Sequence, residues 1–131
     1  MHIVVFDTNV LLSAIGWGGK PNRCLELARS GKIDGVTCLQ LLEELEEKLK
    51  RVLGFSQEEV ADQLADLLGF LTLVPIPAVL QGATSDPGDD KVLECADVSR
   101  ATDIVTGDRR HLLPMKPIKA FRLSPQQRSW R

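Results

Sequence analysis

The feature that most constrains the fold is an apolar run, Ile3–Phe6, that stops at an acid, Asp7. A run this short, led by β-branched residues, is typical of a strand buried on both faces in the middle of a parallel sheet. In open α/β sheets, functional groups gather at the carboxyl ends of the strands. The sequence therefore predicts that Asp7 is a functional carboxylate at such an edge.

A second segment, Ile104–Thr106, repeats this design near the other end of the chain, and Asp108 follows it after one glycine. The first and fourth strands are commonly neighbours in such sheets, so we expect Asp7 and Asp108 to lie at the same edge. A simpler role for Asp108, as the N-cap of a short helical turn at 109–113, is an alternative that the pattern leaves open.

Strands and helices alternate along the rest of the chain, which predicts parallel pairing with right-handed crossovers. Three further strands are expected at Asp34–Cys38, Leu71–Val74 and, at an edge, Ala120–Ser124. Helices are expected at 20–30, 39–53, 57–68 and 87–101, and a glycine-rich loop at Gly16–Gly19. The predicted architecture is a three-layer α/β/α sandwich with a parallel sheet of about five strands.

Composition sets the broad class of the protein. The 131 residues, of which 44% are hydrophobic and 26% are charged, suit a single globular domain over 1–131. No segment approaches the roughly 20 apolar residues of a membrane span, and the N-terminal run is too short for a signal peptide. Three cysteines without a metal-binding pattern favour a reducing, cytoplasmic location.

Charge is unevenly distributed, although the formal net charge is only −2. From Arg109 to Arg131 there are seven basic residues and no acid. This segment is either a contact surface for phosphates or a solvated tail, and the sequence favours neither interpretation over the other.

Two of the expected helices carry further candidate acids. On the longest helix, Glu44 and Glu46 both flank the apolar stripe, so the periodicity does not choose between them. At the start of the last helix, Asp86 is explained as an N-cap and Asp89 as a first-turn acid. Asp90 is not needed by the cap, so we expect it to join the acids at the sheet edge.

Three or four carboxylates close together cannot all stay ionised without a cation between them. Oxygen ligands of this kind favour Mg²⁺ or Mn²⁺. Such an ion suits the metal-assisted hydrolysis of a phosphodiester. The two histidines, His2 and His111, have no neighbouring serine or cysteine pattern that indicates a nucleophilic site.

Four short motifs follow one another along the chain. They are Phe-Asp-Thr-Asn-Val-Leu-Leu-Ser-Ala (6–14), Leu-Leu-Glu-Glu-Leu (41–45), Asp-Pro-Gly-Asp-Asp-Lys-Val-Leu (86–93) and Ile-Val-Thr-Gly-Asp (104–108). In this order they resemble the motifs of PIN-domain nucleases. The resemblance covers nearly the whole chain and is closest to the VapC-like toxin components of prokaryotic toxin–antitoxin pairs.

The resemblance implies a Rossmann-like sheet in the strand order 3-2-1-4-5. It also implies cleavage of single-stranded RNA with Mg²⁺ or Mn²⁺. By position, the resemblance assigns the four family acids, as catalytic residues and metal ligands, to Asp7, Glu44, Asp90 and Asp108.

Two further positions match, and two depart from the family pattern. Asn9 and Thr106 match polar positions that support the site. Cys38 stands where many relatives have serine before the helix, but it does not touch the metal ligands. Gly88 stands where relatives often carry a further acid. This departure leaves open whether Asp89 or Asp90 faces the metal.

The expected partners are an RNA substrate, a cognate antitoxin protein and a second copy of the chain in a homodimer, all implied by the resemblance. In this interpretation Arg109, Arg110 and the basic segment after them hold the RNA by its phosphates.

Three alternatives stay open. The first is a catalytically silent module of the same fold that binds RNA or a protein. The second is a Mg²⁺-dependent phosphatase, although such enzymes usually have a second acid where Asn9 stands. The third is a dinucleotide-binding domain, although no G-x-G-x-x-G follows the first strand.

Overall fold

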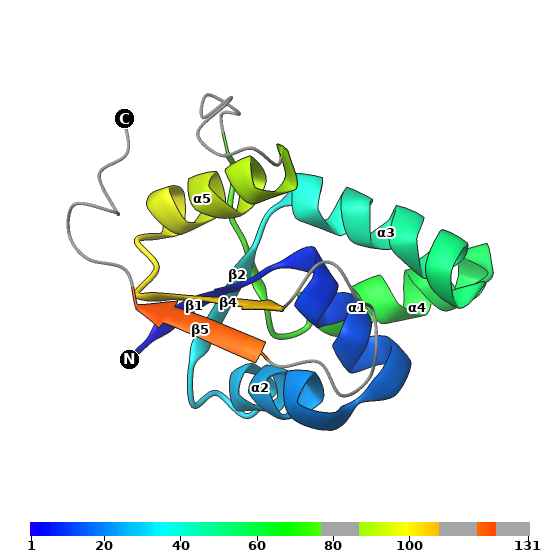
Figure 1. The fold of residues 1–131 in the computed structure, drawn as a ribbon, viewed down its shortest axis with the longest axis horizontal. Coiled ribbons are helices and arrows are strands. Elements are labelled where there is room, and N and C mark those ends of the chain that lie inside the picture. The colour runs from blue at the N-terminus through cyan, green and yellow to red at the C-terminus, as the bar shows by residue number, and fades with distance from the viewer. Residues whose placement is uncertain (77–86, 108–117, 123–131) are drawn as a thin grey trace.

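The computed structural model describes residues 1–76, 87–107 and 118–122, with the side chains of 87–90, 107 and 118–122 outside the description. Its elements, in chain order, are β1 (Ile3–Phe6), α1 (Thr8–Trp17), α2 (Gly19–Arg29), β2 (Asp34–Thr37), α3 (Leu39–Leu53), α4 (Gln57–Leu68), β3 (Thr72–Leu73), α5 (Pro87–Ser99), β4 (Asp103–Gly107) and β5 (Ile118–Arg122). The predicted alternation of strands and helices is confirmed (Figure 1).

The five strands form one sheet in the order β3-β2-β1-β4-β5, which confirms the order expected from the family resemblance. The pairs β3–β2, β2–β1 and β1–β4 are parallel, as predicted. The prediction is wrong for β5, which pairs antiparallel with β4. The reason is the connection at 108–117, which is shorter than the dozen or more residues that a parallel crossover usually needs.

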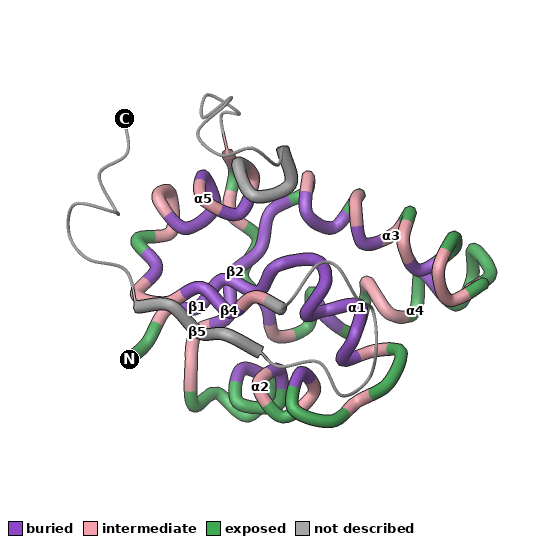
Figure 2. The backbone as a smooth tube through the Cα atoms, in the orientation of Figure 1, coloured by how far each residue is buried: buried purple, intermediate pink, exposed green. Residues whose placement is uncertain are grey.

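Helices cover both faces of the sheet, so the predicted α/β sandwich is confirmed. On one face, Phe6 and Val105 pack in a core with buried residues of α1, α2, α3 and α4. On the other face, Val5 and Ile104 pack with α5 and with Leu41 of α3. Figure 1 shows α5 and α2 on opposite sides of the strands, and Figure 2 shows the buried residues gathered along the central strands.

The prediction of a loop at Gly16–Gly19 is wrong, because α1 runs through Trp17 and α2 begins at Gly19. Only Gly18 separates the two helices. Its φ of 75° lies in the left-handed region that glycine adopts without a steric cost, and its N–H bonds the carbonyls of Ser13 and Ala14. One glycine in this conformation therefore ends the first helix and allows the second to begin at once.

The two following helices begin and end where the sequence predicts. Helix α3 carries its apolar stripe against the core and ends at Gly54, whose φ of 70° is that of a left-handed C-cap. Helix α4 begins with the expected capping box: Ser56 accepts from the Glu59 N–H, and the Glu59 carboxylate accepts from the Ser56 N–H.

The remaining boundaries differ from the predictions by a few residues. The last strand lies at Ile118–Arg122 rather than 120–124, and β3 is shortened to Thr72–Leu73. In the part of the chain that is described, no helix combines the length and the apolar character needed to cross a bilayer.

Leu49 and Leu39 on α3 provide a matched test of where the core lies. Leu49 is fully buried, whereas Leu39 is 58% exposed. We expect Leu49→Ala to lower the free energy of unfolding by about 2–5 kcal/mol, because it leaves a cavity in the core. Leu39→Ala is expected to change it by about 0.5 kcal/mol or less. Urea denaturation of both variants checks this, and equal losses would contradict the placement of α3.

Candidate functional site

Asp7 lies at the junction between β1 and α1 and is only 1% exposed. Its backbone is extended, and its Oδ1 accepts a hydrogen bond from the Val10 N–H at 2.9 Å, so it is the N-cap of α1. The predicted carboxylate at the end of the first strand is therefore also a structural cap, a role that the sequence interpretation did not assign to it. Burial and capping fix the position of the carboxylate at the sheet edge.

The end of β4 lies beside Asp7. The parallel register pairs Phe6 with Val105, and the Asp7 N–H donates to the Val105 carbonyl at 3.0 Å. Thr106 follows directly in β4, so it reaches the same edge as Asp7. Asp108, the predicted fourth acid, lies outside the described residues, as do Arg109 and Arg110.

Asn9 and Glu44 are joined by one side chain, that of Lys48. The Lys48 Nζ donates to the Asn9 Oδ1 at 3.0 Å and lies 3.3 Å from the Glu44 Oε1. Asn9 lies in the first turn of α1, two residues after Asp7, and Glu44 lies on α3. The structure therefore brings oxygens from two separate helices to one ammonium group, that of Lys48, near the carboxyl edge of the sheet.

The start of α5 lies on the other side of Glu44. The Lys91 Nζ is 3.8 Å from the Glu44 Oε2, so each oxygen of this carboxylate has an ammonium group near it. Helix α5 begins at Pro87, as predicted, so Asp89 and Asp90 lie in its first turns. Their side chains are outside the description, but the Lys91 side chain of the same helix reaches Glu44.

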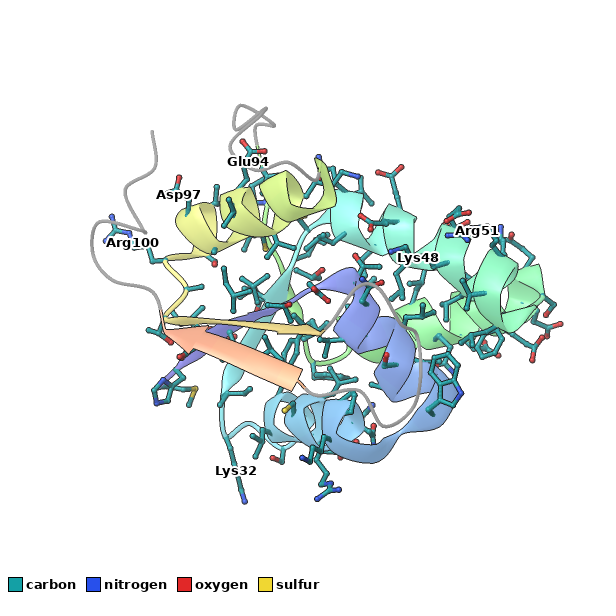
Figure 3. All side chains as sticks on the ribbon, in the orientation of Figure 1. Lys32, Lys48, Arg51, Glu94, Asp97 and Arg100 are labelled. Atoms are coloured by element: carbon teal, nitrogen blue, oxygen red, sulfur yellow. The ribbon has the colours of Figure 1, made fainter. Side chains whose placement is uncertain are left out.

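Helical periodicity did not show whether Glu44 or Glu46 faces the candidate site. The orientations of the two side chains on α3 distinguish them. The side chain of Glu44 is 23% exposed and faces Lys48 and Asn9. Glu46 is 37% exposed and pairs with Lys50 at 3.3 Å, away from this set. Figure 3 shows Lys48 between α3 and α1. Of the two glutamates, Glu44 is therefore the one that the fold turns toward the sheet edge.

The donor chemistry of this region fits a hard divalent cation. Carboxylate and amide oxygens, such as those of Asp7, Asn9 and Glu44, are the ligands that Mg²⁺ prefers. Two of these oxygens already lie within about 3.3 Å of one ammonium, so the geometry accommodates a positive charge. Within residues 1–76 and the described parts of 87–122, no three His, Cys, Asp or Glu side chains form a group that could hold a metal.

Sequence reasoning missed Lys48 and Lys91. The signal for Lys48 is its position four residues after Glu44 on a helix, which allows an ion pair. That signal is weak, because the same spacing also gives the Glu46–Lys50 and Glu47–Arg51 pairs on the solvated side. Lys48 differs from the other two basic residues because it contacts Asn9 on α1. That contact arises from helix packing, so the helical spacing alone does not reveal it.

The Thr37 side chain is a second feature that the sequence did not single out. Thr37 ends β2 and is 1% exposed, and its hydroxyl has no hydrogen-bond partner among the described residues. A buried hydroxyl without a partner is uncommon in folded proteins and often marks a site for an ordered water or a ligand.

Cys38 and Cys95 join the start of α3 to α5. Both are free and fully buried, and they pack in the same core cluster. A hydrogen bond between the two thiols lowers the pKa of Cys38, while burial opposes this shift. The same hydrogen bond and burial raise the pKa of Cys95. The pair therefore ties together the two helices that carry Glu44 and Asp90.

Comparison with protein families decides the classification. A model of the family described as PIN domain matches residues 3–110, which is most of the chain. The chain belongs to the PIN-domain family. The match spans β1 to β4 and so includes every candidate acid. Searches among curated proteins and among solved structures find no match.

Membership sets the general class of activity. PIN domains are generally nucleases, and they typically use divalent metal ions. The oxygen donors at the carboxyl edge of this sheet are compatible with that chemistry. The family therefore supports a hydrolase of the nuclease type, and the finer assignment depends on the site residues.

Two substitutions of Asp7 separate its structural role from its chemical one. Asparagine is as good an N-cap as aspartate, whereas alanine is not. We expect Asp7→Ala to lower the free energy of unfolding by about 1–2 kcal/mol through loss of the cap. Asp7→Asn is expected to keep most of that stability. Urea denaturation without added metal measures both, and an equal loss in the two variants would contradict the capping role.

Proposed function

We propose that this PIN domain is a divalent-metal-dependent endoribonuclease that cleaves RNA phosphodiester bonds. The observation that carries the proposal is that Asn9 and Glu44 both contact the Lys48 ammonium, and that Asn9 follows the buried Asp7 by two residues. Family membership supports the nuclease class, and the oxygen-rich edge supports metal assistance.

In this proposal Asp7, Glu44, Asp90 and Asp108 are the metal ligands and catalytic acids. A bound Mg²⁺ or Mn²⁺ supplies positive charge that stabilises the transition state and promotes attack by water. The rigid placement of Asp7 by its cap keeps its carboxylate at a fixed position in the site.

The supporting polar residues have distinct roles in the proposal. Asn9 offers an amide oxygen that shares the Lys48 ammonium with Glu44, and Thr106 is at the end of β4, directly after the residue whose carbonyl accepts from the Asp7 N–H. Asp89 is the alternative to Asp90 for the ligand from α5. The absence of a carboxylate at Asn9 disfavours the phosphatase alternative, which usually needs an acid at that position.

The RNA and the biological partner are assigned from the family resemblance and from charge. Arg109, Arg110 and the basic residues after them are proposed to bind the phosphates of a single strand. The closest resemblance is to toxins of toxin–antitoxin pairs, so we propose a cytoplasmic toxin, with an antitoxin protein as its partner and a homodimer as its assembly.

One observation favours a second candidate, a PIN-fold module that binds RNA without cleaving it. Lys48 and Lys91 both lie near the Glu44 carboxylate, so protein ammonium groups already neutralise this acid. A silent module would keep these ion pairs and would not take up a divalent ion. Metal binding therefore separates the two candidates.

Glu44 and Glu46 provide a matched pair for testing the nuclease. Both lie on α3 and both pair with a lysine four residues later. We expect Glu44→Gln to weaken Mn²⁺ binding by about tenfold or more and to abolish cleavage, because it removes a ligand charge. Glu46→Gln is expected to leave both properties unchanged. Calorimetric titration of Mn²⁺ and cleavage of a labelled single-stranded RNA measure these effects.

Asp7→Asn tests whether the carboxylate of Asp7 is needed for cleavage, since asparagine preserves the cap but cannot be ionised. Turnover in this folded variant at the rate of the unmodified protein would contradict the nuclease assignment. Binding of RNA without Mn²⁺ uptake or cleavage in the unmodified protein would favour the silent module.

A further inference from the structure

Lys48 differs from the other basic residues of α3. Lys50 and Arg51 each pair with a glutamate four residues earlier and are 41% and 62% exposed. Lys48 has the same helical pairing with Glu44, but it is only 20% exposed and also donates to the Asn9 Oδ1. In Figure 3, Lys48 lies toward α1, whereas Arg51 lies on the outer side of α3.

The position of the Lys48 ammonium is that of a bridging cation. It lies 3.0 Å from an amide oxygen on α1 and 3.3 Å from a carboxylate oxygen on α3. Asn9 is buried and Glu44 is half-buried, so these oxygens are partly removed from water. Oxygens in that situation need a positively charged or hydrogen-bonding partner. Lys48 supplies one that belongs to the chain itself.

We propose that Lys48 holds the place of the divalent cation in the metal-free site, where it positions Asn9 and Glu44 and competes with the metal for the Glu44 carboxylate. The inference rests on the metal site of the proposed function, but it does not depend on the identity of the RNA. Lys48 is a positioning residue in this role, because it acts through Asn9 and Glu44.

Electrostatics fixes the direction of the expected effect. A metal ion that binds Glu44 must displace the Lys48 ammonium from the carboxylate or bind beside it. A unit charge and a divalent charge about 5 Å apart in water repel by enough to change a binding constant by roughly tenfold. Removing the Lys48 charge therefore strengthens metal binding, and the same change leaves the metal-free site without its bridge.

The experiment compares three variants of the full chain in the absence of RNA. Lys48→Met removes the charge but keeps an unbranched side chain of similar length. Lys48→Arg keeps the charge. Lys50→Met removes a charge from the same helix, at the same 3.3 Å separation from a glutamate, but away from Asn9. Mn²⁺ affinity is measured by calorimetry, and thermal unfolding is followed with and without Mn²⁺.

We expect Lys48→Met to bind Mn²⁺ about three- to tenfold more tightly than the unmodified protein. Its melting temperature is expected to fall without metal and to recover when Mn²⁺ is added. Lys48→Arg and Lys50→Met are expected to keep the affinity of the unmodified protein within about twofold. Near-ultraviolet circular dichroism checks that each variant is folded.

Unchanged or weaker Mn²⁺ binding in folded Lys48→Met would overturn the inference, as would the same gain in Lys50→Met. Absence of Mn²⁺ binding in both the unmodified protein and Lys48→Met would overturn the inference together with the proposed metal site. Tighter Mn²⁺ binding in Lys48→Met, combined with no cleavage of single-stranded RNA by the unmodified protein in a separate assay, would support the inference while contradicting the nuclease function, so the two failures are distinguishable.

Discussion

The hydrogen bond between the Asp7 carboxylate and the Val10 N–H joins the central strand to the helix that follows it. Because β1 lies in the middle of the sheet, between β2 and β4, this junction fixes the position of Asp7 at the carboxyl edge of the central strands. The cap holds a carboxyl group at a position that is almost completely buried. Folding and the proposed chemistry therefore depend on the same carboxylate, and its structural role accounts for how its position is maintained before any metal binds.

The half-buried carboxylate of Glu44 needs a positively charged or hydrogen-bonding partner in the metal-free protein. The described part of the chain meets this need with Lys48 and Lys91, one near each oxygen of Glu44. This arrangement is compatible with a metal site, because a divalent ion can exchange with an ammonium that occupies the same set of oxygens. The two ion pairs hold the Glu44 side chain in place in the metal-free protein.

Much of the fold was predictable, because short buried runs that end in acids have few alternatives to a parallel sheet. The direction of β5 was not, since it depends on the length of a connection rather than on the strand itself. The tight junction at Gly18 was missed because its glycine-rich composition is equally typical of a loop. Lys48 was missed because three equivalent ion pairs on α3 have the same spacing, and only the packing of α3 on α1 selects the one that reaches Asn9. The candidate acids are predicted from the motifs, whereas the contacts of Asp7 and Glu44 are properties of the tertiary structure.

The most direct test of the proposed metal site is to locate Mn²⁺ in crystals of the protein by its anomalous scattering. We expect a peak at the carboxyl edge of the sheet, within about 2.2 Å of carboxylate oxygens from Asp7 and Glu44, with the Lys48 ammonium displaced from Glu44. A peak at another place, or no peak at saturating Mn²⁺ with the Lys48 bridge intact, would contradict the claim that these acids form a divalent-metal site.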